Sequence, residues 1–149
     1  MLFGKRERAI VRILVVEDEP LVAFDNEHLL SNAGYEVVDT VDNLAAAQKA
    51  IDEEQIDLVL SDIVLRGDGD GLDVARAAAA RNIPVLFVSG GCPVEARDLA
   101  VGCLAKPYSD KIMKAALDTL DTLFQGGDAK KLPPGLSLYE SAARFSKTG

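Results

Sequence analysis

The sequence predicts an α/β fold in which five parallel strands form one doubly wound sheet with helices on both faces. Short apolar runs alternate with longer segments of helical periodicity over most of the chain. Several of the runs place β-branched residues in succession, which is typical of a strand buried on both faces. Because parallel neighbours need crossover connections, each strand is expected to be followed by a helix.

The apolar runs predict five strands, at residues 10–16, 36–41, 57–61, 84–88 and 102–105. The segments between and after them predict helices at residues 20–33, 43–53, 72–81, 93–100 and 109–124. Pro20 suits the first turn of the first helix. In the last helix, one apolar face is formed by Ile112, Ala116, Leu120 and Leu123.

The composition divides the chain into an N-terminal extension, one domain and a tail, at residues 1–9, 10–124 and 125–149. Within the tail, residues 138–146 are predicted as a short helix, because Ser137 and Glu140 have the spacing of a capping box. A helix of roughly ten residues is not stable alone in water. It must dock on its own domain, dock on a partner or stay disordered.

The bulk properties exclude several classes of function. The 149 residues are enough for one core. The net charge of −8, from 16 basic and 24 acidic residues, argues against direct nucleic-acid binding. No apolar run reaches the ~18 residues that span a bilayer, and the N-terminus lacks a signal-peptide pattern. We therefore expect a cytoplasmic protein without a membrane partner.

The two cysteines are Cys92 and Cys103. Since disulfides are rare in the cytoplasm, we expect two free, partly buried thiols. A disulfide between them is the alternative.

Residues capable of chemistry follow four of the predicted strands. They are Glu17-Asp18-Glu19, Asp62, Ser89-Gly90-Gly91 and Lys106-Pro107. In a doubly wound sheet the ligand site lies at the carboxyl ends of the strands. The four groups are therefore expected to form a single site.

These groups lie in four segments that together resemble the response-regulator receiver domain: residues 15–20 (VVEDEP), 57–63 (DLVLSDI), 85–90 (VLFVSG) and 105–108 (AKPY). Each segment alone is a weak signal, but all four occur in the family's order and spacing over residues 10–124. The resemblance implies a flavodoxin-like fold with strand order 2-1-3-4-5. It also implies a phospho-accepting receiver of a two-component or phosphorelay system.

The resemblance implies that Asp62 is the phosphorylated residue and that the cofactor is Mg²⁺. Asp18 and Asp62 would bind the ion directly, Glu17 through water, and Val64 through its backbone carbonyl. Physical chemistry gives an independent reason for a cation. Close carboxylates repel one another by about 4 kcal/mol per pair at an intermediate dielectric, and a hard divalent ion with oxygen ligands offsets this.

Three further residues are implied to bind the phosphoryl group and to switch with it. Lys106 would supply a positive charge, Ser89 a hydroxyl donor and Gly90 a neighbouring backbone N–H. The Lys106-Pro107 bond is expected to be cis, as is common at this place in the family.

The switch region departs from the family's pattern. Cys103 stands where many receivers have an aromatic residue, so the usual aromatic coupling is in doubt. Val64 and Gly91 occupy the positions that orient the hydrolytic water, and neither can do so. We therefore expect a phosphoform that hydrolyses slowly. The loop after Asp62 is also about one residue longer than the pattern and has Arg66 in place of its proline.

Three other polar residues near these motifs have simpler interpretations. Glu19 is expected to cap the following helix, Asp57 to be a turn residue at the far end of its strand, and His28 to be a solvated or packed side chain.

As partners we expect a histidine kinase or a histidine phosphotransfer protein, together with an unknown downstream protein. The tail is too short for a DNA-binding or enzymatic output domain, so output is expected through protein contact. A homodimer could form through the face made by residues 93–100, 102–105 and 109–124. We expect that the protein is not an enzyme and catalyses at most its own phosphorylation and slow autodephosphorylation. The alternatives are a Mg²⁺-dependent phosphohydrolase with an aspartyl intermediate and a phosphorylation-independent binding module.

Overall fold

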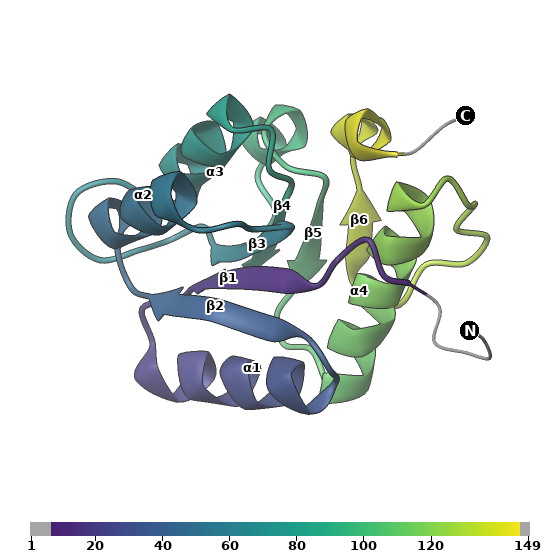
Figure 1. The fold of residues 1–149 in the computed structure, drawn as a ribbon, viewed down its shortest axis with the longest axis horizontal. Coiled ribbons are helices and arrows are strands. Elements are labelled where there is room, and N and C mark those ends of the chain that lie inside the picture. Colours follow the sequence, from purple (N-terminus) through teal and green to yellow (C-terminus); the bar gives the residue numbers. More distant parts are fainter. Residues whose placement is uncertain (1–6, 147–149) are drawn as a thin grey trace.

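A six-stranded sheet runs through the centre of the protein, whose computed structural model describes residues 7–146 (Figure 1). The strand order is β2-β1-β3-β4-β5-β6, with the first five parallel and β6 antiparallel to β5. This confirms the predicted α/β class and the order 2-1-3-4-5, and adds a sixth strand. The strands are β1 (Arg12–Val16), β2 (Glu36–Val41), β3 (Leu58–Asp62), β4 (Val85–Ser89), β5 (Gly102–Ala105) and β6 (Leu136–Leu138).

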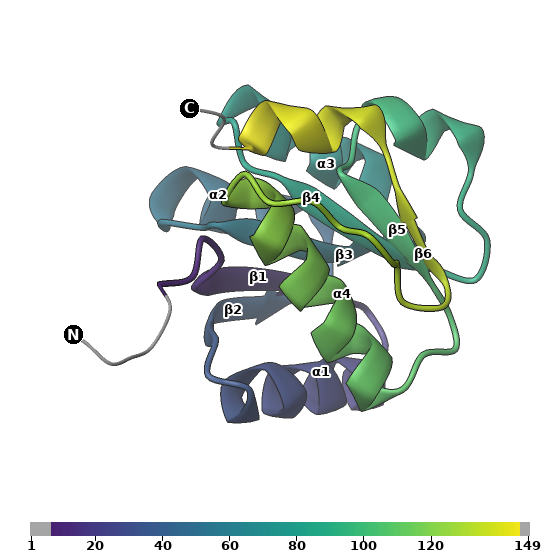
Figure 2. The ribbon, with the colours of Figure 1, turned by 90° about the vertical axis from the view of Figure 1, so that its right-hand side faces the viewer.

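Helices cover both faces of the sheet (Figures 1 and 2). One apolar layer contains α1 (Pro20–Asn32) and α4 (Asp110–Phe124). The other contains α2 (Leu44–Glu53), α3 (Gly71–Ala80) and the short 3-10 helix η1 (Val94–Asp98). The sheet is therefore the middle of three layers.

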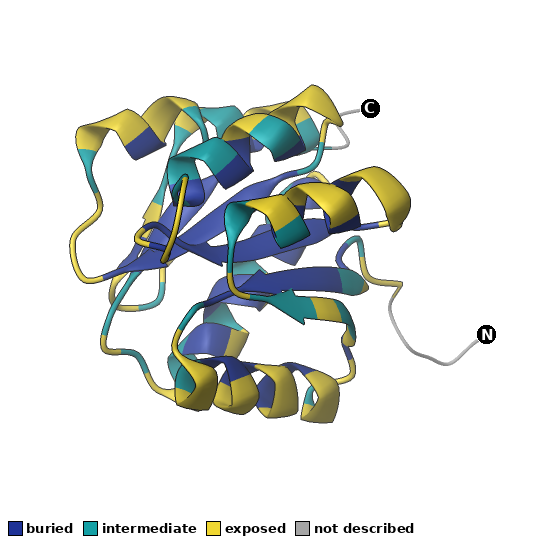
Figure 3. Cartoon of the chain, turned by 90° about the vertical axis from the view of Figure 1, so that its left-hand side faces the viewer, coloured by how far each residue is buried: buried dark blue, intermediate teal, exposed yellow. Residues whose placement is uncertain are grey.

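The apolar runs explain this layering. In β1, Ile13 and Val15 pack into the layer of α1 and α4, while Leu14 and Val16 pack into the layer of α2 and α3. Alternate residues of a strand point to opposite faces, so a continuous apolar run fills both layers. The central strands β1, β3, β4 and β5 are buried, whereas the edge strand β2 and the outer faces of the helices are half-buried or exposed (Figure 3).

Polar side chains mark the starts of three helices. Asn43 accepts a hydrogen bond from the N–H of Ala46 at 2.9 Å, and Ser109 accepts one from Ile112 at 3.1 Å. Asp70 forms a capping box at the start of α3. Glu19 occupies the N-cap position before α1, as predicted, but its side chain makes no capping hydrogen bond.

The fourth predicted helix is the first clear difference from the sequence-based expectation. Residues 93–100 form only the five-residue 3-10 helix η1, in which Ala96 alone is buried. An α-helix gains most of its stability from packing an apolar face. With so little apolar surface to bury, this segment stays a single tight turn.

The cysteines are the second difference. Cys92 and Cys103 form a disulfide, so the expectation of two free thiols is wrong. Cys103 belongs to β5 and Cys92 to the loop before η1. The fold brings them together because that loop turns back over the neighbouring strand.

The tail is the third difference. It contributes β6, paired with β5, and a 3-10 helix η2 (Glu140–Phe145), in place of one helix over residues 138–146. Ser137 lies in β6, and Tyr139 precedes η2 without a side-chain cap, so the predicted capping box does not form. The segment docks on its own domain, where η2 packs against α4 through the rings of Phe124 and Phe145 at 6.0 Å.

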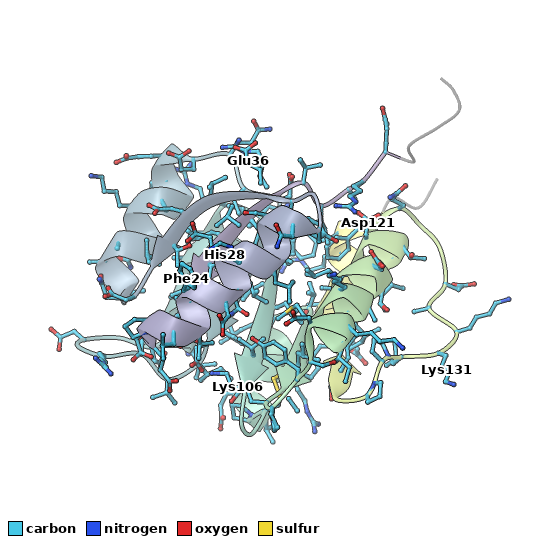
Figure 4. The ribbon with its side chains drawn as sticks, turned by 90° about the horizontal axis from the view of Figure 1, so that it is seen from below. Phe24, His28, Glu36, Lys106, Asp121 and Lys131 are labelled. Atoms are coloured by element: carbon cyan, nitrogen blue, oxygen red, sulfur yellow. A yellow bond between two sulfur atoms is a disulfide. The ribbon has the colours of Figure 1, made fainter. Side chains whose placement is uncertain are left out.

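The N-terminal extension is attached through Asp121 on α4 (Figure 4). One carboxylate oxygen of Asp121 accepts hydrogen bonds from the backbone N–H groups of Ala9 and Ile10, at 2.6 and 2.9 Å. Asp57 has a similar role at the start of β1, accepting from Val11 and Arg12. Among residues 7–146, no helix combines the length and the apolar character needed to cross a bilayer.

Candidate functional site

Three carboxylates meet at the carboxyl ends of β1 and β3. Glu17 and Asp18 directly follow β1, and Asp62 is the last residue of β3. One oxygen from each of the three side chains lies within 4.8 Å of the others. Parallel strands bring these residues together because their carboxyl ends share one edge of the sheet.

Lys106 completes the cluster from the end of β5. Its Nζ donates to Oδ2 of Asp62 at 2.9 Å and lies 3.4 Å from Oε1 of Glu17. The Lys106-Pro107 bond is cis, and the backbone N–H of Lys106 donates to the carbonyl of Ser89 at 2.8 Å. The residue predicted to supply positive charge is thus beside the predicted nucleophile.

The acidic cluster and the lysine perturb one another. Burial raises the pKa of Glu17, whose side chain is 1% exposed, and this outweighs the effects of the Glu19 N–H and the Lys106 charge. Burial also acts to lower the pKa of Lys106, but the hydrogen bond to Asp62 and the charges of Asp62 and Glu17 raise it above its ordinary value. Lys106 therefore stays protonated at neutral pH.

The donor set fits a hard divalent cation. All three side chains offer carboxylate oxygens, and those of Asp18 and Asp62 are each 12% exposed, so both can reach an ion that keeps water ligands. Mg²⁺ prefers anionic oxygen ligands and usually keeps several waters in its coordination sphere. The site therefore fits the Mg²⁺ implied by the sequence.

The predicted switch hydroxyl is engaged with its own loop. Ser89 donates from Oγ to the carbonyl of Gly91 at 2.7 Å and accepts from the N–H of Gly91 at 3.2 Å. Gly90 is exposed, and open space surrounds the position that a Cβ would take. Ser89 and Gly90 thus stand at the end of β4 beside the acidic cluster, but no hydrogen bond joins the Ser89 side chain to it within residues 7–146.

The two remaining predicted positions differ in their surroundings. Val64 follows Asp62 by two residues, and its side chain is 73% exposed. Cys103 is fully buried, and its sulfur is bonded to Cys92. Phe87 and Ser137 flank Cys103 on the neighbouring strands. Cys103, which takes the place of the usual aromatic residue, therefore lies inside the sheet.

Two residues beside the site were missed by sequence reasoning. A Cβ on Gly71 would lie 2.1 Å from the carbonyl oxygen of Asp62, so only glycine allows α3 to approach β3 this closely. Arg66 places its Nε 3.7 Å from Oδ2 of Asp18. The Asp70-Gly71 pair was a signal for the first, whereas the reach of a loop arginine has no sequence signal.

Comparison with known families identifies the family of this chain. The family model described as the response regulator receiver domain matches residues 13–118. This chain belongs to the response regulator receiver family. The match contains all the predicted site residues, from Glu17 to Lys106. Receiver domains bind Mg²⁺ at an acidic pocket and take part in two-component signalling with histidine kinases and downstream effectors.

Curated relatives are similar over part of their length. The phyllosphere-induced regulator PhyR of Methylorubrum extorquens is 34% identical over 79 residues, which are 52% of this chain and 30% of PhyR. The transcriptional regulatory protein PdtaR of Mycobacterium tuberculosis is 29% identical over 120 residues, which are 76% of this chain and 58% of PdtaR. The receiver thus spans less than two thirds of either relative.

Solved structures of similar size share the fold. The solution structure of SdrG from Sphingomonas melonis has a TM-score of 0.64 and 34% identity, covering 75% of this chain and 97% of SdrG. A receiver domain from Methylobacillus flagellatus has a TM-score of 0.66 and 26% identity, covering 73% of this chain and 97% of that domain.

Proposed function

We propose that this receiver accepts a phosphoryl group on Asp62, with Mg²⁺ bound by Asp18, Asp62, Glu17 and the Val64 carbonyl, and signals by protein contact. The observation that carries the proposal is the convergence of three carboxylate oxygens within 4.8 Å with Lys106 Nζ 2.9 Å from Asp62. A structural ion pair needs one carboxylate. Three carboxylates around one lysine keep excess negative charge, which suits a cation and a phosphoryl group.

Asp62 is held ready for nucleophilic attack. Its Oδ1 accepts from the N–H of Ile63 at 2.8 Å, and its Oδ2 accepts from Lys106. A carboxylate oxygen of Asp62 forms the new bond to phosphorus, and the bond from phosphorus to the donor's imidazole nitrogen breaks, leaving the electron pair on that nitrogen. Mg²⁺, when bound, supplies positive charge to the phosphoryl oxygens.

Lys106 and Ser89 act on the transferred group. The ammonium of Lys106 donates to a phosphoryl oxygen as charge develops there. Ser89 can donate its hydroxyl to another oxygen once it leaves Gly91. The backbone N–H of Gly90 lies next to it, so the loop after β4 responds to the state of Asp62.

The phosphoryl donor is proposed to be a histidine kinase or a histidine phosphotransfer protein. Leu21 and Phe24 lie on the first turns of α1, next to the acidic site, and are 81% and 60% exposed. Figure 4 shows Phe24 beside His28 on this helix, with ring centroids 4.3 Å apart. Exposed apolar side chains at the rim of the site suit contact with a protein donor. His28 is thus a surface neighbour of Phe24.

The test is intact mass after incubation with acetyl phosphate and Mg²⁺. We expect the wild type to gain one phosphoryl group and the Asp62→Asn variant to gain none. The matched control is Asp68→Asn, which makes the same change at an exposed aspartate of the adjacent loop and should be phosphorylated like the wild type.

The same experiment separates the alternatives. Multiple turnover of phosphomonoesters would replace the receiver proposal with a phosphohydrolase. An unmodified wild type would replace it with a phosphorylation-independent binding module. Phosphorylation of Asp62→Asn would refute the assignment of Asp62.

A further inference from the structure

The disulfide joins the loop that follows the proposed switch residue Ser89 to the neighbouring strand β5. Cys92 lies three residues after Ser89, at the end of the loop that leaves β4. Cys103 lies within β5, where Phe87 of β4 and Ser137 of β6 flank it in the sheet. The covalent bond therefore ties a loop residue to a fixed point in the core.

The loop has few other attachments. Among the described residues, Gly91 forms hydrogen bonds only with Ser89, and nothing lies within 4 Å of the position that a Cβ on Gly90 would take. Val94 is 66% exposed, and Ala96 is the single buried residue of η1. Within residues 7–146, the Ser89–Gly91 pair is the one side-chain hydrogen-bonded link between residues 90–93 and another element, whereas the next turn is held by Ser141 of η2, whose hydroxyl donates to the carbonyls of Arg97 and Ala100. Since adjacent glycines give the backbone unusual freedom, the disulfide is the principal restraint on residues 90–93.

The two sulfurs differ in access. Cys92 is exposed, whereas Cys103 is fully buried. A cavity of about 500 Å³, lined by Cys92, Arg97, Asp98 and residues 137–140, opens beside the exposed cysteine. A small oxidant or reductant can therefore reach Cys92, and the buried Cys103 is placed as the resolving partner.

We propose that Cys92 and Cys103 are a reversible thiol–disulfide site, closed by a hydroperoxide and opened by a dithiol, and that the closed bond restrains the loop that follows Ser89. In closure, the Cys92 sulfur attacks one oxygen of the peroxide, the O–O bond breaks, the other oxygen leaves as an alcohol or as water, and Cys92 becomes a sulfenic acid. The Cys103 sulfur then attacks that sulfur and releases water. The two thiols lose two electrons and two protons, and the peroxide is reduced.

The restraint has a direct consequence for Ser89. Its hydroxyl forms hydrogen bonds with the backbone of Gly91, the residue that directly precedes Cys92. To reach a phosphoryl oxygen, Ser89 must leave Gly91, and the loop must move with it. This inference rests on the proposed function of Asp62. We expect the reduced protein to be phosphorylated several-fold faster than the oxidised protein.

The first test counts thiols in the full-length protein. The protein is treated with hydrogen peroxide and then with dithiothreitol, both without denaturant, and a sample is quenched after each step. Each sample is alkylated under denaturing conditions and its intact mass is measured. We expect no alkylated thiols after peroxide and two after dithiothreitol, reversibly. Two thiols remaining after peroxide, or a bond that opens only in denaturant, would overturn the proposal.

The second test measures the restraint by hydrogen exchange. Peptides covering residues 90–96 should exchange roughly tenfold faster in the reduced protein, while peptides from α1 should not change. Cys92→Ser, an exposed and nearly isosteric substitution, should match the reduced wild type with or without reductant. Equal exchange in the two redox forms would show that the bond restrains nothing.

Phosphorylation by acetyl phosphate is then compared in both redox forms. Faster modification of the reduced form supports the coupling, and equal rates refute it. If Asp62 accepts no phosphoryl group in either form, the proposed function fails, but thiol counting and hydrogen exchange still decide the redox site.

Discussion

Val64 lies two positions beyond Asp62, where its 73% exposed side chain faces solvent beside the acidic site. An isopropyl group has no hydrogen-bonding atom, and Gly91, the other position that the family uses to orient water, has no side chain. A water molecule attacking the phosphoryl group therefore lacks a positioning partner. The phosphoform is expected to last well beyond seconds.

Val64→Asn should shorten the phosphoform's lifetime. An amide at this position can orient water, and a gain of roughly 1.4 kcal/mol at the transition state corresponds to about tenfold faster hydrolysis. The lifetime is measured by intact mass after removal of acetyl phosphate in Mg²⁺. Val64→Ala is the matched control and should hydrolyse like the wild type. A wild-type lifetime of only seconds would contradict this interpretation.

The reactive residues could be predicted from sequence because chemically capable side chains stand at the ends of the apolar runs that predict strands. Asp62 and Lys106 each end a buried apolar run, and parallel strands bring such ends together. The role of Gly71 could not be predicted in this way. Position 71 requires glycine because the carbonyl of Asp62 lies against it, and this contact exists only in the folded structure. The disulfide likewise depends on how the loop before η1 folds over β5.

Among the elements, the tail changes the surface of the receiver most. β6 pairs with the edge of β5, and η2 packs against both α4 and η1. The face considered for a homodimer is formed by η1, β5 and α4, so the tail occupies part of it. Sheet edges are sites of unwanted pairing, and β6 covers the edge of β5.

A pair of alanines in η2 tests this docking. Ala142 is 8% exposed, while the next residue, Ala143, is exposed. Ala142→Asp should lower the free energy of unfolding by about 1–3 kcal/mol, because it buries a charge without a partner. Ala143→Asp adds the same charge in solvent and should stay within about 0.5 kcal/mol of the wild type. Urea unfolding measures both, and equal effects would mean that η2 does not dock.

Sequence periodicity predicted the long elements better than the short ones. The helix of residues 109–124 has a continuous apolar stripe, and α4 occupies Asp110–Phe124. η1 and β6 have only five and three residues, and their form depends on neighbours far away in sequence. Short segments carry too few side chains for their periodicity to distinguish helix from strand.

For the whole molecule, negative charge is the main cost of the site. The chain carries a net charge of −8, and three carboxylates meet at one end of the sheet. Each close carboxylate pair costs about 1 kcal/mol even in a water-like dielectric. The protein without a cation is therefore less stable than its core alone would allow.

Mg²⁺ should stabilise the wild type, by about 2.7 kcal/mol at a concentration 100 times its Kd. Asp18→Asn should be more stable than the wild type without Mg²⁺, by roughly 1 kcal/mol, and should lose most of the response to the ion. Thermal unfolding in MgCl₂, with NaCl of equal ionic strength as the control for screening, measures both effects. An equal response in the variant would place the cation elsewhere.

The most direct measurement of the central proposal is borohydride trapping. Borohydride reduces an aspartyl phosphate to homoserine, and peptide mass spectrometry then identifies the residue that carried the phosphoryl group. After acetyl phosphate and Mg²⁺, we expect homoserine at position 62 and nowhere else, with the yield lost when Mg²⁺ is chelated. Homoserine at position 18, at another aspartate or at none would contradict the assignment of Asp62 as the phosphoryl acceptor.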